Sequence, residues 1–248
     1  MSSSTIVVIP CFNEAQRLSI QAFTAFAQRW RHGRFLFVDD GSTDETLSIL
    51  TSLRETLPDH FDVLRLPQNV GKAEAVRRGI LEAFALNPLY VGFWDADLAT
   101  PLDALPLFEE VLRDRPVVDI VLGARVKLLG RDIRRRPFRH YLGRIFATAV
   151  ALTLGLEIYD SQCGAKLFLA SNTVRVLFDT PFLSRWIFDV EILARFKRLR
   201  QAGVPTTVEQ SIYELALPLW HDVPGSKLRL WDFAMAVRDL ARIYSSFR

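Results

Sequence analysis

The stretch Tyr90-Val91-Gly92-Phe93-Trp94-Asp95-Ala96-Asp97 joins an apolar run directly to two carboxylates. Within a β-strand, Asp95 and Asp97 would point to opposite faces, because side chains alternate along a strand. Just past the end of a strand, where the chain turns, both carboxylates can converge on one hard cation. Mg²⁺ prefers oxygen ligands and commonly combines one or two carboxylates with substrate phosphates. We therefore interpret the stretch as a strand that ends in a metal site for a diphosphate; the simpler alternative is a surface turn.

Four other short runs share this apolar character, and we expect each to be a strand: Thr5–Pro10, Arg34–Val38, Asp62–Leu66 and Val118–Leu122. Helical patterns separate the five runs and end near residues 31, 57, 86 and 113. We expect Ser42 or Thr43 to cap the second helix and Pro101 to open the fourth. Strands alternating with helices at this spacing predict an α/β protein with a mostly parallel sheet.

Polar loops follow the predicted strands. They comprise residues 11–14, 39–44, 69–72, 95–97 and 123–125. In sheets of this kind, ligands bind in the crevice beyond the carboxyl ends of the strands. The sequence therefore predicts that these loops line one binding site.

The second half of the chain combines a basic segment with an apolar one. Residues 127–144 contain Lys127 and six arginines, and residues 145–156 are apolar nearly all round a predicted helix. A charge run of this kind forms a solvated face, a nucleic-acid site or an anionic membrane interface. We favour the membrane interface and expect no nucleic acid. Packing of residues 145–156 into the core is the simpler alternative.

The remaining segments predict further elements of one continuous domain. Strand-like runs occupy residues 166–169 and 208–217, and helical patterns occupy 188–200 and 228–244. The last helix is amphipathic, and it either lies in the membrane interface or packs on the domain.

Composition narrows the protein class. Hydrophobic residues make up 50% and charged residues 24%, as in ordinary globular proteins. Two cysteines give no disulfide framework and fit a reducing, cytoplasmic setting. The sequence shows no signal peptide and no run of the roughly 18 apolar residues that a membrane span needs. We therefore expect a peripheral protein on the cytoplasmic face of a membrane.

Seven short motifs occur in order along nearly the whole chain: Pro10-Cys-Phe-Asn-Glu14, Val38-Asp-Asp-Gly-Ser-Thr-Asp44, Asn69-Val-Gly-Lys72, Asp95-Ala-Asp97, Gly123-Ala-Arg125, Asp160-Ser-Gln-Cys-Gly164 and Gly225-Ser-Lys227. Together they resemble the family-2 inverting glycosyltransferases, in the branch of dolichyl-phosphate glucose and mannose synthases and bacterial polyprenyl-phosphate relatives. The resemblance implies a GT-A type (Rossmann-like) α/β fold with C-terminal amphipathic helices. It implies one domain, 1–248, with a nucleotide-sugar-binding half, 1–125, and an acceptor- and membrane-facing half, 126–248.

The resemblance also implies which residues hold the nucleotide-sugar donor. They are Pro10, Phe12, Glu14, Val38, Asp40, Lys72, Asp95, Ala96 and Asp97. Among these, Glu14 is expected on the ribose hydroxyls and Asp40 on the base, with the Val38 backbone beside it. Asp95 and Asp97 are expected to bind Mg²⁺ or Mn²⁺, and Asp97 is also counted as catalytic.

On the acceptor side, the residues implied to bind a phosphate are Arg125, Arg139, Lys227 and, as a weaker candidate, Lys166. Asp160 matches a carboxylate that acts at the acceptor, as a base or as an orienting group, and Asp189 is the alternative. Two positions depart from the mannose-type pattern: Ala99 replaces a glutamine near the metal, and His221 replaces a late arginine.

The expected reaction is metal-dependent transfer of a hexose, glucose from UDP-glucose, to a polyprenyl phosphate at a membrane surface. Within the same class, GDP-mannose as donor or a soluble saccharide as acceptor are alternatives. A catalytically silent nucleotide-sugar-binding partner of a membrane protein is the alternative from a different class.

Overall fold

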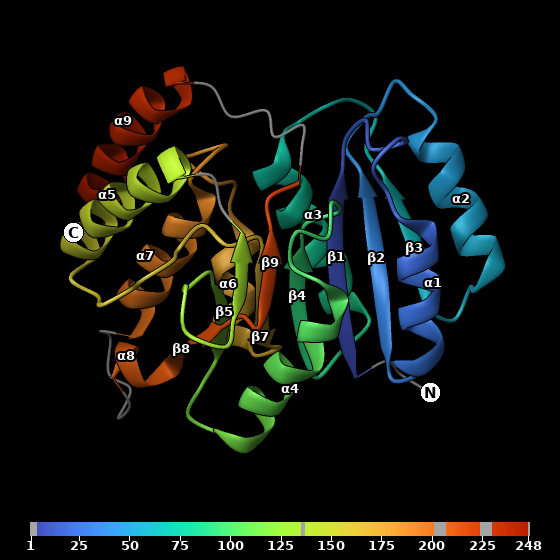
Figure 1. Cartoon of the computed structure of the whole chain (residues 1–248), viewed down its shortest axis with the longest axis horizontal. Helices are drawn as coiled ribbons and strands as arrows, with labels where there is room; N and C mark the ends of the chain where they lie inside the picture. Colours follow the sequence, from blue (N-terminus) through green and yellow to red (C-terminus); the bar gives the residue numbers. More distant parts are fainter. Residues whose placement is uncertain (1–3, 135–136, 201–206, 224–229, 248) are drawn as a thin grey trace.

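A computed structural model describes residues 4–134, 137–200, 207–223 and 230–247, and their side chains except those of 137–140, 142 and 230–234. The main sheet consists of β1 (Thr5–Cys11), β2 (Gly33–Asp39), β3 (Phe61–Arg65), β4 (Tyr90–Trp94), β5 (Ile120–Ala124), β7 (Ala165–Leu169) and β8 (Ile212–Ala216). The strand order is β3-β2-β1-β4-β7-β5-β8 (Figure 1).

Neighbouring strands of this sheet are parallel except around β7, which runs antiparallel to β4 and β5. Trp94 at the end of β4 pairs with Ala165 at the start of β7. The segment before β7 therefore reaches the same edge as the segment after β4. The mostly parallel α/β sheet predicted from the sequence is confirmed.

Helices cover both faces of the sheet, which explains why its inner strands are apolar throughout. Along β1, Ile6 and Val8 pack into one core cluster while Val7 and Ile9 pack into the other. The helices on the Val7 face are α1 (Ile20–Arg29), α2 (Thr46–Thr56) and α4 (Leu105–Asp114), with the short 3₁₀ helix η1 (Leu102–Ala104) before α4. Those on the Ile6 face are α3 (Lys72–Ala85), α6 (Asn172–Asp179) and α7 (Phe188–Arg200).

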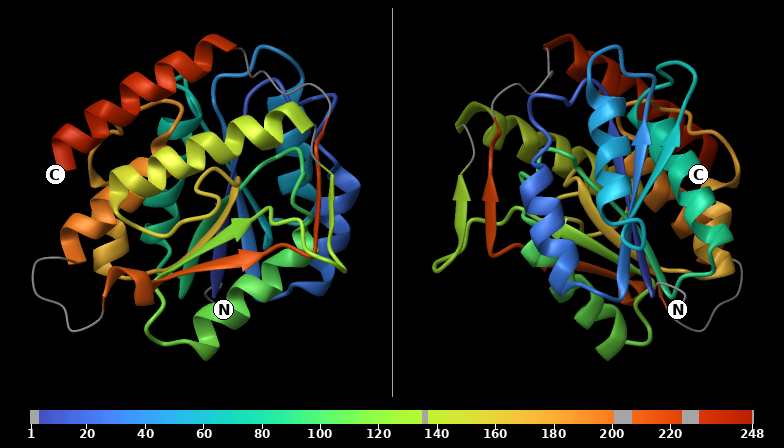
Figure 2. Two further views of the ribbon diagram at one scale, coloured as in Figure 1. Left: turned by 60° about the vertical axis from the view of Figure 1, so that its left-hand side comes forward. Right: turned by 90° about the vertical axis from the view of Figure 1, so that its right-hand side faces the viewer.

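Two long helices form an outer layer beyond α7. They are α5 (Pro137–Leu154) and α9 (Leu230–Phe247), which lie side by side at the end of the molecule away from α1 and α2 (Figures 1 and 2). Val150 and Leu154 on α5 are buried, so the core packing that the sequence left open as the alternative is present on part of the helix. Tyr141, Ile145 and Leu152 on the same helix are 70%, 68% and 80% exposed. Helix α5 is thus buried on one side and apolar on its solvent side.

The structure corrects two local predictions. Residues 208–211 are not part of a strand: they form helix α8 (Val208–Ser211), because Thr207 and Gln210 make a capping box before β8 begins. Neither Ser42 nor Thr43 caps α2. That helix begins at Thr46, and the Ser42 hydroxyl instead accepts a hydrogen bond from the Asn13 N–H at 3.1 Å.

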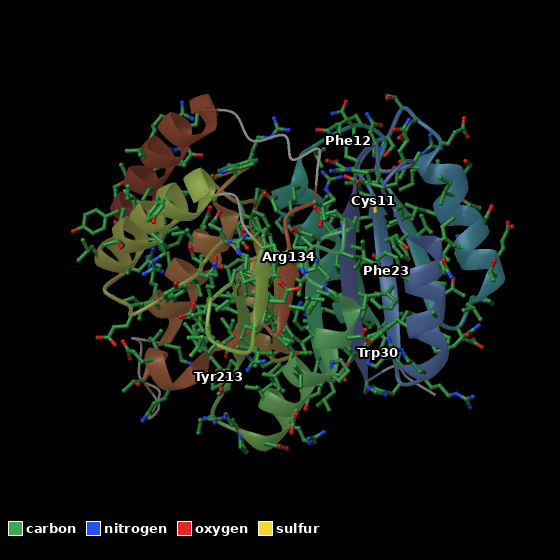
Figure 3. All side chains as sticks on the ribbon, viewed as in Figure 1. Cys11, Phe12, Phe23, Trp30, Arg134 and Tyr213 are labelled. Atoms are coloured by element: carbon green, nitrogen blue, oxygen red, sulfur yellow. The ribbon has the colours of Figure 1, made fainter. Side chains whose placement is uncertain are left out.

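Helix α6 and a second, two-stranded sheet add to the expected architecture. The second sheet pairs β6 (Asp132–Arg134) with β9 (Leu219–His221) in parallel. Arg134 lies near the centre of the view in Figure 3. These additions come from the half of the chain in which alternation of strands and helices is least regular.

Candidate active site

The carboxyl ends of β1, β2 and β4 and the start of β7 meet at one edge of the sheet, which is the upper edge in Figure 1. Phe12, just after β1, lies near this edge, whereas Trp30 lies near the opposite one (Figure 3). The loops after β1 and β2 are joined directly: Asn13 Oδ1 accepts the Thr43 N–H at 2.9 Å, and the Glu14 N–H donates to Thr46 Oγ1 at 2.8 Å. These two hydrogen bonds tie the two loops together.

The expected donor residues of these loops differ in accessibility. Pro10 and Phe12 are partly exposed, whereas Val38 is buried within β2. Glu14 is largely buried, and one of its carboxylate oxygens accepts a hydrogen bond from Arg17 at 2.5 Å. The structure therefore places Phe12 and Glu14 in the loop after β1 and Pro10 near the end of that strand. Because the Val38 side chain is buried, only its backbone can line a site.

Asp40 fixes the loop that leads into α3. Its two carboxylate oxygens accept the N–H groups of Val70 at 2.8 Å and Gly71 at 2.9 Å. Burial raises the pKa of Asp40, and these two hydrogen bonds oppose that rise. Gly71 has φ of +94°, a backbone conformation that favours glycine, and the guanidinium of Arg185 lies beside it.

Asp95 and Asp97 form an acidic pair at the end of β4. Lys72, the first residue of α3, places its amine 2.5 Å from Asp95 Oδ1, and Asp97 Oδ1 accepts the Ala99 N–H at 3.1 Å. Burial and the negative charge of Asp95 raise the pKa of Asp97. Burial alone would lower the pKa of Lys72, but the carboxylates around it raise it. Ala96 between the two acids is buried.

Gly164 lies directly against this acidic pair. Its carbonyl accepts the Asp95 N–H at 2.9 Å. A Cβ atom at position 164 would overlap the Asp95 carboxylate, so only glycine leaves that carboxylate its place. Gly164 belongs to the loop that begins at Asp160, and the contact therefore joins the expected donor side to the expected acceptor side.

The acidic pair suits a divalent cation that takes its other ligands from a substrate. Within the described ranges, His, Cys, Asp and Glu side chains form no group of three or more that could hold a metal. Two neighbouring carboxylates, one of which resists ionisation, are a donor set that a hard cation stabilises. Asp95 and Asp97 therefore fit Mg²⁺ or Mn²⁺ bound together with diphosphate oxygens.

Arg125 and Asp160 form a bidentate ion pair beside Gly164. Nε and Nη2 of Arg125 donate to the two Asp160 carboxylate oxygens at 2.6 and 2.7 Å. The backbone N–H of Arg125 also donates to the Asp160 carboxylate, at 3.1 Å. The guanidinium also lies over the Trp220 ring, 5.3 Å from its centroid. Burial would lower the pKa of Arg125, but Asp160 raises it well above its usual value. The arginine is therefore fully charged at neutral pH.

Lys166 occupies a different environment from the one expected of a phosphate ligand. Its side chain is fully buried, and its amine contacts Asp189 Oδ1 at 2.5 Å and the Cys163 carbonyl at 2.7 Å. In this arrangement the amine is not presented to an acceptor. The same contact engages the carboxylate of Asp189, the alternative to Asp160.

Two expected acceptor ligands cannot be placed. Lys227 lies outside the described residues, and Arg139 lies on α5 with its side chain outside them. His221, the residue at the position of a late arginine, contacts Asp132 through Nε2 at 2.8 Å. It is thus engaged within the small β6–β9 sheet.

Two residues near the site were not predicted from the sequence. Arg185, before α7, has its guanidinium beside Gly71 and favours the ionised form of Asp40. Glu214 on β8 accepts two backbone N–H groups next to Asp160. A charged residue within the strand-like run Ile212–Ala216 was the only available signal for Glu214, and nothing in the loop sequence distinguished Arg185.

Comparison with known proteins identifies the family. Residues 6–173 match the family model described as Glycosyl transferase family 2. The chain is a family-2 glycosyltransferase. Relatives of this glycosyltransferase include the dolichyl-phosphate beta-glucosyltransferase of Drosophila melanogaster, 33% identical over 96% of this chain and 73% of that protein. The Saccharomyces cerevisiae dolichyl-phosphate beta-glucosyltransferase is 32% identical over 97% of this chain and 74% of that protein.

Solved structures resemble this glycosyltransferase along nearly its whole length. Glucosyl-3-phosphoglycerate synthase from Mycobacterium tuberculosis, in complex with Mn²⁺ and UDP-glucose, superposes with a TM-score of 0.69 at 18% identity, covering 98% of this chain and 78% of that chain. S. aureus TarS in complex with UDP superposes with a TM-score of 0.59 at 18% identity, covering 96% of this chain and 64% of that chain. The likeness confirms the GT-A type fold.

Proposed function

We propose that this glycosyltransferase moves glucose from UDP-glucose to a polyprenyl phosphate, with a divalent cation and with inversion at the anomeric carbon. The observation that supports this most strongly is the hydrogen bond from Asp95 to Gly164, which sets the acidic pair beside the loop of Asp160. A diphosphate held by a cation on the acidic pair and a phosphate held by Arg125 would meet at this edge of the sheet.

On the donor side, the loops after β1, β2 and β4 would bind UDP-glucose. Glu14 and Asp40 offer carboxylate oxygens to the ribose hydroxyls and the base, respectively. Asp95 and Asp97 would hold Mg²⁺ or Mn²⁺, which supplies a Lewis acid for the charge that builds on the leaving diphosphate. Lys72, held against Asp95, adds a fixed positive charge at the same place.

On the acceptor side, positioning matters more than deprotonation. A phosphate monoester has a second pKa near 6, so its attacking oxygen is already anionic at neutral pH. A guanidinium has five N–H donors, and pairing with Asp160 uses only some of them. In this proposal Arg125 binds the acceptor phosphate, and Asp160 orients Arg125. Arg139 and Lys227 remain predicted acceptor ligands.

The names of the relatives support glucose as the sugar and a dolichyl-type phosphate as the acceptor. Ala99, in place of the glutamine of mannose-type relatives, points the same way. GDP-mannose as donor, a saccharide acceptor and a silent binding protein are the other outcomes that experiments can return.

A donor screen by thermal denaturation separates these outcomes. With Mn²⁺ present, UDP-glucose at about 100 times its Kd is expected to stabilise the fold by about 2.7 kcal/mol, because it binds only the folded state. GDP-mannose at the same concentration is expected to leave the midpoint unchanged. A larger shift with GDP-mannose would reassign the donor.

The outer helices support peripheral membrane binding. None of the helices in the described part of the chain could cross a bilayer. Tyr141, Ile145 and Leu152 recur at helical spacing on the exposed side of α5, and exposed Val237 and Arg242 lie on neighbouring α9. An apolar face flanked by basic residues suits a helix lying in an anionic interface. We propose that α5 and α9 bring the acceptor-facing half to the membrane.

The double variant Ile145→Glu/Leu152→Glu is expected to weaken binding to phosphatidylglycerol vesicles at least about tenfold, because burying each apolar side chain contributes about 1.5–3 kcal/mol. Co-sedimentation measures this binding. The matched control, Leu89→Glu/Val117→Glu, makes the same charge change at side chains that are 53% and 49% exposed away from these helices. Equal loss in both double variants would contradict the docking face.

A further inference from the structure

Glu214 is the acidic residue of β8, and it lies on the same side of that strand as Ile212, which faces the core cluster of Ile6 and Val8. It pairs with Leu122 of β5, and Ile212, two residues earlier on the same side, packs against the core cluster that contains Leu122. A carboxylate is costly to place there unless its oxygens are hydrogen-bonded. Glu214 is only partly exposed, and burial raises its pKa. Such a position needs a specific partner.

The partner is the backbone immediately before and at Asp160. One Glu214 oxygen accepts the Tyr159 N–H at 2.8 Å, and the other accepts the Asp160 N–H at 2.7 Å. Arg144 of α5 holds the other side of the same residue: its Nη1 donates to the Tyr159 carbonyl at 3.0 Å, and its guanidinium lies 3.7 Å from the centre of the Tyr159 ring. The backbone at 159–160 is therefore fixed from two elements.

This fixed backbone determines where the Asp160 carboxylate lies. From there the carboxylate takes three hydrogen bonds from Arg125, the guanidinium that the proposed function places on the acceptor phosphate. A small displacement of the Asp160 backbone would move the carboxylate and with it the guanidinium. In this arrangement Glu214 would act on the acceptor through the backbone of Tyr159 and Asp160.

We propose that Glu214 is a positioning residue for the acceptor phosphate: it clamps the Tyr159 and Asp160 N–H groups and thereby sets the orientation of Arg125. The inference rests on the proposed function. A positioning residue would affect acceptor binding selectively, whereas a purely structural residue would affect both substrates. Selectivity is expected because β8 is remote from the donor loops after β1 and β2 in the strand order. Loss of the clamp should change acceptor binding and spare donor binding.

The test compares Glu214→Gln with wild type and with Glu209→Gln, the same change at an exposed residue of the neighbouring helix. Glutamine keeps the shape but replaces one accepting oxygen by an NH₂ group that faces a backbone N–H. Steady-state rates are measured with UDP-glucose and a short-chain prenyl phosphate. Because hydrogen bonds to charged groups are strong, we expect KM for the prenyl phosphate to rise about tenfold or more, with KM for UDP-glucose unchanged.

The outcomes separate the two proposals. An unchanged acceptor KM, or an equal rise in both KM values, would overturn the positioning role while the wild-type activity stands. Absence of turnover by the wild type would reject the proposed function itself. If Glu214→Gln does not fold, Glu214→Asp keeps the charge with a shorter reach and is expected to show the same selective rise. Failure of both variants to fold would assign Glu214 a structural role and overturn the proposal.

Discussion

Asp97→Asn is expected to lower kcat/KM for glucosyl transfer by about a thousandfold while leaving the protein folded. A metal ion supplies several kcal/mol to the departure of an anionic leaving group, and each 1.36 kcal/mol is a factor of ten in rate. Asparagine keeps an oxygen that can accept the Ala99 N–H but removes the charge that a hard cation needs. Steady-state kinetics with saturating Mn²⁺ measure the loss of kcat/KM, and calorimetric titration of UDP-glucose in the presence of Mn²⁺ measures the loss of donor binding.

The same substitution is expected to raise the thermal midpoint of the metal-free protein. Burial and Asp95 raise the pKa of Asp97, so its favourable contribution to stability is present at low pH and is lost as pH rises through the folded-state pKa. At neutral pH an uncharged amide removes that penalty. Asp114→Asn, at an exposed residue, is the matched control and should change neither kcat/KM nor the thermal midpoint. Normal activity of Asp97→Asn would contradict the metal site.

Lys166→Met is expected to lower the free energy of unfolding by about 3–5 kcal/mol, because it leaves the Asp189 carboxylate buried without its cation. The lysine side chain is fully buried, and Asp189 is 2.5 Å from its amine. Urea denaturation followed by tryptophan fluorescence measures the change. The effect belongs to the fold, since Lys166 is enclosed between β7 and α7.

A second substitution distinguishes loss of the ion pair from loss of packing. Lys166→Met/Asp189→Leu replaces both charges by apolar side chains and should recover most of the lost stability. The control Arg113→Met breaks an exposed pair with Asp114 and should leave the urea midpoint unchanged. A double variant no more stable than Lys166→Met would show that the charge on Asp189 is not the cause.

The donor half of the fold could be predicted because its local signals agree. In 1–125, short apolar runs alternate with helical patterns, and each polar loop follows a strand, so the shared edge of the sheet follows from topology alone. Asp40, Lys72, Asp95 and Asp97 were identified in this way and through the family motifs. The structure brings Lys72, Asp95 and Asp97 together, while the binding roles of these residues remain predictions.

The acceptor half could not be predicted to the same degree because its contacts are long-range. The antiparallel direction of β7 depends on pairing with β4 and β5, and no local pattern encodes it. Lys166 illustrates the consequence: a lysine near a phosphate motif suggests a ligand, but its amine is neutralised by Asp189 from α7. Glu214 illustrates the reverse, since its partners lie more than fifty residues earlier in the chain.

The most direct test of the account is transfer of labelled glucose from UDP-glucose to a short-chain prenyl phosphate, with and without Mn²⁺. We predict a lipid-extractable glucosyl phosphate of β configuration, formed by the wild type only when the cation is present. UDP-glucose that binds without being consumed, or label that reaches only water, would contradict the claim that this edge of the sheet joins a diphosphate donor to a phosphate acceptor.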